Sequence, residues 1–376
     1  MRDRTASHDA EPVAVERDGG RVILDNGLLR ATVEADGTVS SLVDLSGDRE
    51  LVPGGTRLGR YELLDNEPFH WDAWEVQRDA FLTAHSLRES RIDAVDMAAD
   101  GACVVRVVAR NDDVTIVTCI TLHPDRRTLD FSAQVDWLTE EEFLKVDIPL
   151  GVQATNAQYE CQYGMVERPI QKNSRSDEAK FESCTHRFVR VADASYAAAV
   201  VNASTYGSDV SPIHGDDGTR GAMVRLSLLS APLYPDPRTD RGAHEFAWSV
   251  VADASMPAVL DEATRLNTAE LEDVPAFEPL ARLDVVEGVP VLDWVKTADD
   301  GSGDLILRVY EATGGRAVAS LDMCAELAEA TMREVDVLEG DGLDPNMPRA
   351  LDGCKPANGA VLKLAPFQLA TLRISR

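Results

Sequence analysis

Short runs of β-branched residues, separated by turn residues, constrain the fold of this chain more than any other feature. Between residues 21 and 44, three such runs are separated by Asp25-Asn26-Gly27 and Ala35-Asp36-Gly37. Asn-Gly and Asp-Gly supply the positive φ angles that a tight hairpin needs, so this segment predicts three strands joined by two turns. The pattern recurs, and we expect strands over 21–24, 29–34, 38–44, 103–110, 114–123, 128–137, 143–149, 197–201, 224–229, 245–251, 289–294, 305–311, 317–321, 334–338, 361–364 and 370–374.

Helical signals are scarce by comparison. The best covers 257–266, where apolar residues recur at three- and four-residue spacing after a proline. Strands that follow one another without intervening helices favour antiparallel sandwiches over βαβ units. A Pro-rich, acidic stretch at 273–279 suggests a boundary. We therefore predict an all-β chain: a flexible lead-in over 1–18, a large antiparallel β-sandwich over 19–275 and a small C-terminal β-sandwich domain over 276–376.

Charge and cysteine spacing limit the partners and the compartment. Lys and Arg number 37 against 65 Asp and Glu, a net charge of −28, which repels phosphate backbones and anionic lipid. We therefore expect neither nucleic acid nor a membrane as a partner. The sequence has no apolar run long enough to cross a bilayer and no signal-peptide pattern at its start. The six cysteines include no C-x-x-C pair, which is typical of a reducing compartment, so we predict a cytoplasmic protein.

Common catalytic signatures are missing from the sequence. It contains no phosphate-binding glycine loop and no G-x-S-x-G, and Trp248 stands where a zincin motif that starts at His244 needs its second histidine. Four patches, at 66–75, 159–169, 172–182 and 234–245, instead mix aromatic, carboxylate and amide side chains. Aromatic faces stack on the C–H face of a pyranose, while carboxylates and amides bond its hydroxyls. These residues favour a carbohydrate-facing β-sandwich, although the same tryptophans also fit a structural role at the end of a sandwich.

Taken in order, these patches resemble the C-terminal region of family 38 glycoside hydrolases, the α-mannosidases. The resemblance runs from about residue 20 to the end of the chain. It is carried by Trp71-Asp72-Ala73-Trp74, by Tyr163-Gly164-Met165-Val166-Glu167-Arg168-Pro169, by Asp177-Glu178-Ala179-Lys180-Phe181-Glu182, by Tyr234-Pro235-Asp236-Pro237, by Asp240-x-Gly242-x-His244-Glu245-Phe246 and by Pro366-Phe367-x-x-x-Thr371-Leu372.

The resemblance implies a large mutarotase-like sandwich (a supersandwich) followed by a smaller β-domain, within an enzyme that hydrolyses terminal α-mannosides with retention. In that family the zinc ion and the nucleophilic aspartate belong to an α/β barrel, which this chain does not resemble. We therefore expect no catalytic residue, no metal ligand and no cofactor on this chain. The expected partners are an α-mannoside or other glycan and a separate catalytic-barrel polypeptide.

The resemblance also suggests which residues face the sugar. A loop of the family's sandwich helps to close the pocket, and the matching stretch here carries Asp240 and Arg241. Arg241 would reach a sugar hydroxyl or an acid on the barrel. Trp71, Trp74 and Tyr163 complete the set of candidate substrate-binding residues.

Two other functions stay open. The first is a stand-alone carbohydrate-binding or scaffold protein, in which Trp71 or Trp74 stacks on sugar. The second is a sugar mutarotase or epimerase, which needs a histidine and a carboxylate that converge in one cleft. The candidates for that pair are His70, His186 and His244 with Glu75, Glu182 and Glu245.

Overall fold

The computed structural model describes residues 11–203, 205–268 and 278–376, and β-strands dominate it. The chain divides into two compact units. The large unit holds the described residues up to Glu160 and those from Glu167 to residue 268. The small unit holds residues 161–166 and the described residues from 278 onward. The predicted all-β fold is confirmed.

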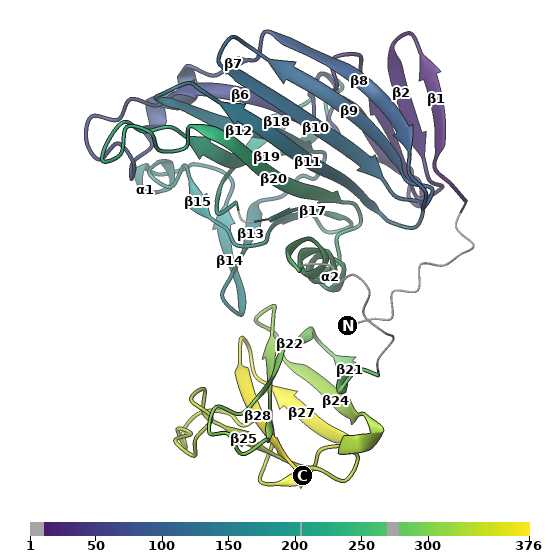
Figure 1. Cartoon of the computed structure of the whole chain (residues 1–376), viewed down its shortest axis with the longest axis vertical. Helices are drawn as coiled ribbons and strands as arrows, with labels where there is room; N and C mark the ends of the chain where they lie inside the picture. Colours follow the sequence, from purple (N-terminus) through teal and green to yellow (C-terminus); the bar gives the residue numbers. More distant parts are fainter. Residues whose placement is uncertain (1–10, 204, 269–277) are drawn as a thin grey trace. The chain divides into compact units, whose positions relative to one another are not determined.

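Three antiparallel sheets carry the strands of the large unit (Figure 1). A five-stranded sheet contains β1 (Ala14–Asp18), β2 (Arg21–Asp25), β3 (Leu29–Val33), β4 (Val39–Asp44) and β5 (Arg49–Glu50) in that order. A six-stranded sheet has the order β15-β18-β19-β12-β6-β7, with β6 (Arg60–Asp65), β7 (His85–Ser86), β12 (Glu142–Leu150), β15 (Ser183–Cys184), β18 (Gly207–His214) and β19 (Arg220–Ser230).

The third sheet has nine strands in the order β14-β13-β16-β17-β20-β11-β10-β9-β8. Its members are β8 (Glu89–Met97), β9 (Cys103–Arg110), β10 (Val114–Leu122), β11 (Thr128–Trp137), β13 (Asn156–Cys161), β14 (Gly164–Pro169), β16 (Phe188–Ala192), β17 (Ala197–Ala203) and β20 (Gly242–Val251). The helical segments of this unit are η1 (Arg78–Leu82), α1 (Arg175–Glu178) and α2 (Met256–Asn267). Helix α2 packs on β17 and β20 (Figure 1) and confirms the one helix that the sequence predicts.

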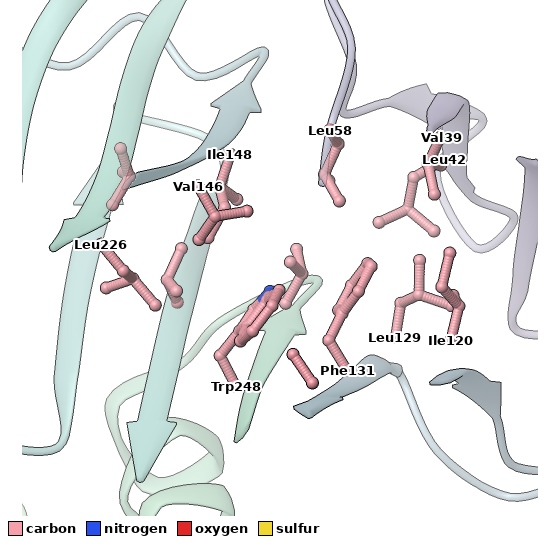
Figure 2. Close-up of a cluster of buried hydrophobic side chains, with 14 of the residues drawn as sticks. Val39, Leu42, Leu58, Ile120, Leu129, Phe131, Val146, Ile148, Leu226 and Trp248 are labelled. Carbon is pink, nitrogen blue, oxygen red and sulfur yellow. The ribbon is translucent and has the colours of Figure 1, made fainter. Parts of the chain in front are cut away.

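The core of the large unit lies between the nine-stranded and six-stranded sheets (Figure 2). Alternate residues of a strand face the same side, so Val146 and Ile148 of β12 both point inward. Opposite them, Trp248 and Phe131 stack with ring centroids 5.3 Å apart. The five-stranded sheet closes the same core, because its Val39 and Leu42 lie over Leu129 and Ile120 in Figure 2.

The hairpin turns follow the glycines that predict them. Gly37 has a φ of +83°, and a Cβ atom there would stand 2.2 Å from the Cγ1 atom of Val107. Gly27 also has a positive φ, +77°, but has open space around it. Glycine is therefore required at residue 37 for two reasons and at residue 27 for one.

The small unit packs a three-stranded sheet and a five-stranded sheet around one core that includes Leu307, Leu321, Leu362 and Leu372. The first sheet has the order β21 (Ala281–Glu287), β24 (Ala317–Met323), β27 (Ala360–Leu364). The second has the order β22 (Pro290–Thr297), β23 (Leu305–Glu311), β28 (Leu369–Ser375), β25 (Thr331–Val335), β26 (Lys355–Pro356). The short helical turn η2 (Ala325–Leu327) lies between β24 and β25 in the chain.

Two predicted segments differ from the structure. The flexible lead-in expected through residue 18 contains the strand β1. Its five side chains are all exposed, and it is held by backbone hydrogen bonds to β2. Its sequence therefore lacks the alternation of apolar residues by which a strand is predicted. The strand expected over 334–338 forms instead as β25, three residues earlier, because Met332 and Val335 are the side chains that enter the core.

Residues 1–10 of the lead-in and the predicted boundary at 275/276 lie outside the described residues. Among the helices of the described ranges, none has both the length and the apolar character that a membrane crossing requires.

Candidate functional site

Three loops meet at one end of the large sandwich and form the best candidate site (Figure 1). We call the loops 66–77, 138–141 and 231–241 together the three-loop site. The Asp72 carboxylate accepts hydrogen bonds from the backbone N–H groups of Leu233 at 2.6 Å and Tyr234 at 2.9 Å. Glu141 donates its N–H to the Ala231 carbonyl at 2.8 Å, and its own carbonyl accepts from Asn66 at 2.7 Å. All three loops are therefore bonded to one another.

Four of the five predicted substrate-facing residues lie in this site. Trp71 and Trp74 are in the first loop, with ring centroids 6.4 Å apart and planes nearly perpendicular. Asp240 and Arg241 are in the third loop, where the Arg241 guanidinium pairs with Glu140 of the second loop at 2.5 Å. Tyr163 belongs to the small unit, in the turn between β13 and β14, and its ring packs edge-on against Tyr310 at 5.3 Å.

Each loop of the site also holds one non-glycine residue in the left-handed backbone region. Trp71 has a φ of +58°, Glu141 of +55° and Asp240 of +62°. This region is sterically unfavourable for residues with a Cβ, at about 1–3 kcal/mol each, and such outliers gather at functional sites. The surrounding fold therefore determines the shape of these loops more than local preference does.

The rings of the site are exposed and its carboxylates repel one another. Phe69, Trp71, Trp74 and Tyr234 are each at least 62 % exposed. Burial raises the pKa of Glu141, and the negative charges of Glu67, Asp72 and Glu140 raise it further. Burial also raises the pKa of Asp240, although His244 opposes that shift. A surface with bare aromatic faces beside hydrogen-bond acceptors is suited to a neutral polyol such as a sugar.

A buried charge cluster holds the first loop against the six-stranded sheet. Lys145 of β12 is fully buried and pairs with Glu182 and, at 2.9 Å, with Asp209. Arg225 of β19 also belongs to the cluster, because its guanidinium pairs with Asp209 at 2.8 Å. Phe81 of η1, which follows the first loop, has its ring centroid 5.2 Å from the Lys145 ammonium and 4.9 Å from the Arg225 guanidinium. The loop with the tryptophans is thus anchored at its far end by an aromatic ring that contacts one buried and one partly buried cation.

Reasoning from sequence missed this cluster, because its members come from strands far apart in the chain. One local signal was available: Lys145 stands in the middle of a predicted buried strand, where a lysine needs a partner.

The histidine and carboxylate candidates for epimerase chemistry each contact residues other than the proposed partner. His244 and Glu245 are neighbours on β20 and therefore point to opposite faces of the sheet. Glu182 is bonded to Lys145 and Ser227, while the His186 ring packs against Tyr206 at 5.6 Å. His70 lies against Phe69 at 4.4 Å, and Glu75 donates its backbone N–H to Trp71.

The family resemblance implies a zinc ion on a barrel that this chain does not resemble, so it predicts no zinc ligands here. Over 11–203, 205–268 and 278–376, no group of three or more His, Cys, Asp or Glu side chains is placed to hold a metal ion.

Comparison with known proteins assigns the family. The family model for the "Glycosyl hydrolases family 38 C-terminal domain" matches residues 24–238, and that for the "Glycosyl hydrolases family 38 C-terminal beta sandwich domain" matches residues 290–372. This chain belongs to the C-terminal domain family of the family 38 glycosyl hydrolases. The resemblance predicted from its motifs is confirmed.

Curated relatives and solved structures agree with this family. Alpha-mannosidase 2C1 of Homo sapiens is 29% identical over 96% of this chain, and the alpha-mannosidase of Saccharomyces cerevisiae is 26% identical over 94%. This chain spans 34% and 35% of their lengths, about a third of each. The crystal structure of an alpha-mannosidase from Enterococcus faecalis V583 has a TM-score of 0.68 and 15% identity, covering 96% of this chain and 43% of that one, so the fold is shared.

Proposed function

We propose that this chain is the C-terminal, carbohydrate-facing part of an α-mannosidase, where it frames the sugar pocket and does not itself cleave the glycosidic bond. The observation that carries this proposal is the three-loop site, in which exposed rings, carboxylates and Arg241 gather at one end of the sandwich. Relatives named as alpha-mannosidases support a mannoside as the substrate. Six cysteines without a C-x-x-C pair support a cytoplasmic location.

Each group of the site has a chemical role in this proposal. Trp71 and Trp74 offer ring faces to the C–H face of a pyranose, and the carboxylates accept hydrogen bonds from its hydroxyls. Arg241 supplies donors, since its side chain stays 40% exposed while it pairs with Glu140. That exposure leaves part of the guanidinium accessible to a sugar hydroxyl or to an acid on a facing domain.

The same end of the sandwich is the surface that we expect to meet the catalytic part of the enzyme. Phe69 and Tyr234 expose large apolar areas there, and such areas mark interaction sites on soluble proteins. We place the zinc ion and the attacking carboxylate on a catalytic barrel outside this chain. That barrel could belong to the same polypeptide or to a separate one.

A stand-alone carbohydrate-binding role is the second candidate, and the exposed pair of Trp71 and Trp74 favours it. It differs from the first in what the isolated chain does. A stand-alone binder quenches its tryptophan fluorescence with mannose and needs no second domain. A framing part of an enzyme binds mannose weakly until the barrel completes the pocket.

The test combines hydrolysis with fluorescence. The purified chain is incubated with an aryl α-mannoside over a range of zinc concentrations, and we expect no turnover. Turnover by this chain alone would show that no other domain supplies the chemistry. In parallel, mannose is titrated into the wild-type chain, the W71A/W74A variant and a W294F control, in which the substituted tryptophan lies in the small unit. Strong quenching that W71A/W74A abolishes and W294F leaves intact favours the stand-alone role.

A further inference from the structure

A groove crosses the outer face of the nine-stranded sheet, and Glu245 and Phe246 are the residues of its lining that also belong to a motif of the family resemblance. Its volume is about 700 Å³, which is within the usual range for small-ligand sites. It is lined by Arg106, Val117, Cys119, Ser132, Ala133, Gln134, Ala203, Glu245, Phe246 and Ala247.

Small side chains in register form the floor of this groove. Across five adjacent strands, Arg106 pairs with Cys119, Cys119 with Ser132, Ser132 with Ala247 and Ala247 with Ala203. Four of these five side chains are no larger than cysteine, so the surface along this row is recessed relative to the longer side chains on either side. Since neighbouring strands lie about 4.8 Å apart, the row is about 19 Å long.

The two sides of the groove differ. On one side, the neighbouring row of outward-facing residues contains Asp130 and Ser249, which pair across β11 and β20. The guanidinium of Arg265 in α2 donates hydrogen bonds to Asp130 at 2.8 Å and to Ser249 at 3.3 Å. On the other side stand Gln134 and Glu245, which pair across β11 and β20. In the part of the chain that the structure describes, the side chains of Gln134, Glu245 and Ser132 make no hydrogen bond or ion pair to protein.

The charges at and around the groove disfavour an anionic ligand. The lining holds one charge of each sign, Glu245 and Arg106, whose guanidinium also lies 3.7 Å from Asp93, while the whole chain carries −28. An anionic ligand would meet repulsion from the rest of the protein. A cationic ligand would be attracted by the chain as a whole, but Arg106 opposes it within the groove. Hydroxyl groups, which both donate and accept, match the mixture of Arg, Gln, Glu and Ser side chains.

We propose that this groove binds a neutral oligosaccharide in extended form, as a second carbohydrate site on the large unit. The choice of a glycan among neutral ligands rests on the proposed function. The Cβ atoms of Ala203 and Ala247 meet the C–H groups of the sugar, and Gln134, Glu245 and Arg106 bond its hydroxyls. Glu245 stands three residues from Gly242, the first residue after the third loop, or about 10 Å along β20. One glycan chain can therefore extend from the three-loop site into the groove.

The thiol of Cys119 provides a reporter within the floor. The chain is alkylated with iodoacetamide, with and without a linear mannose tetrasaccharide, and each cysteine is followed by mass spectrometry. We expect the sugar to slow alkylation of Cys119 by roughly tenfold at saturation, because thiol reactivity depends on access. The exposed thiols of Cys184 and Cys354 are internal controls whose rates should not change.

Two variants localise the effect. Ala247→Phe fills the floor and should abolish the protection of Cys119, while Thr115→Phe, on the same face of β10 but outside the lining, should preserve it. Unaltered rates for Cys119 at saturating sugar would overturn the proposal, and so would protection that persists in A247F. Because this readout is independent of Trp71 and Trp74, a failure here is distinguishable from a failure of the proposed function, which the tryptophan quenching reports.

Discussion

Replacing Lys145 by methionine tests whether the buried charge cluster supports the large unit. The ammonium group of Lys145 neutralises Glu182 and Asp209, and removal of one partner from a buried ion pair costs about 3–5 kcal/mol. Arg225 still holds Asp209 through hydrogen bonds of 2.8 to 3.1 Å in the variant, and the Glu182 side chain is 23% exposed. We therefore expect the lower end of that range, about 3 kcal/mol, in the free energy of unfolding.

The assay is urea unfolding of the full chain, followed by tryptophan fluorescence. Four of the five tryptophans (Trp71, Trp74, Trp137 and Trp248) belong to the large unit and dominate the signal. In thermal unfolding the same change corresponds to a fall of about 6–12 °C for a unit of this size. Lys180→Met is the matched control, because Lys180 is exposed, and its effect should stay within about 0.5 kcal/mol.

The pH dependence of the free energy of unfolding gives a second measurement on the same variant. Burial raises the pKa of Glu182 even with Lys145 present, and loss of the ammonium raises it further. An acid whose folded pKa lies above its unfolded pKa destabilises the protein when ionised, and protonation relieves this as pH falls. The deficit of K145M should therefore shrink from pH 7.5 to pH 5.5, and K145M/E182Q should recover part of the stability. A K145M variant within 1 kcal/mol of wild type, or one that E182Q does not rescue, would refute this reasoning.

Three further predictions follow from other positions. In urea unfolding, Gly37→Ala should destabilise the large unit by about 1–3 kcal/mol more than Gly27→Ala. Both residues have a positive φ, but only residue 37 is packed against Val107, and equal losses of stability would contradict this. Arg241→Ala should change stability by less than about 1 kcal/mol, since both partners of its ion pair are at least 40% exposed, and yet weaken mannose binding in the fluorescence titration; unchanged binding would remove Arg241 from the site. Burial raises the pKa of Glu311, but hydrogen bonds from Thr313, Phe367 and Gly314 outweigh burial and lower that pKa, so the small unit should lose stability as pH falls below about 4.5. E311Q should reduce that acid sensitivity when Trp294 fluorescence is followed, and the rest should come from Asp300, Asp304, Asp336 and Glu339, whose pKa values are also lowered.

Much of the three-loop site could be predicted from sequence, because its residues cluster in short motifs. Trp71 and Trp74 are three residues apart, and Asp240 and Arg241 are adjacent, so each pair is visible in a single patch. What remained hidden was that the patches meet, since Asp72 reaches Leu233 across 161 positions of the chain. Tyr163 showed the opposite case: its motif resembled the others, yet its ring packs on Tyr310 within the small unit.

Local chemistry therefore determined many of the strands, such as β9 to β12, together with the tight turns and the one long helix, but strands such as β1, β8 and β18 were not predicted from it. Alternating apolar residues, glycines with positive φ and a proline-led amphipathic run each act over a few neighbouring residues, and the sequence displays them directly. Tertiary structure alone decided the buried cluster around Lys145, the floor of the outer groove and the left-handed loops. Each of those depends on strand register, which brings together residues far apart in the chain, and no short window of sequence specifies which strands become neighbours.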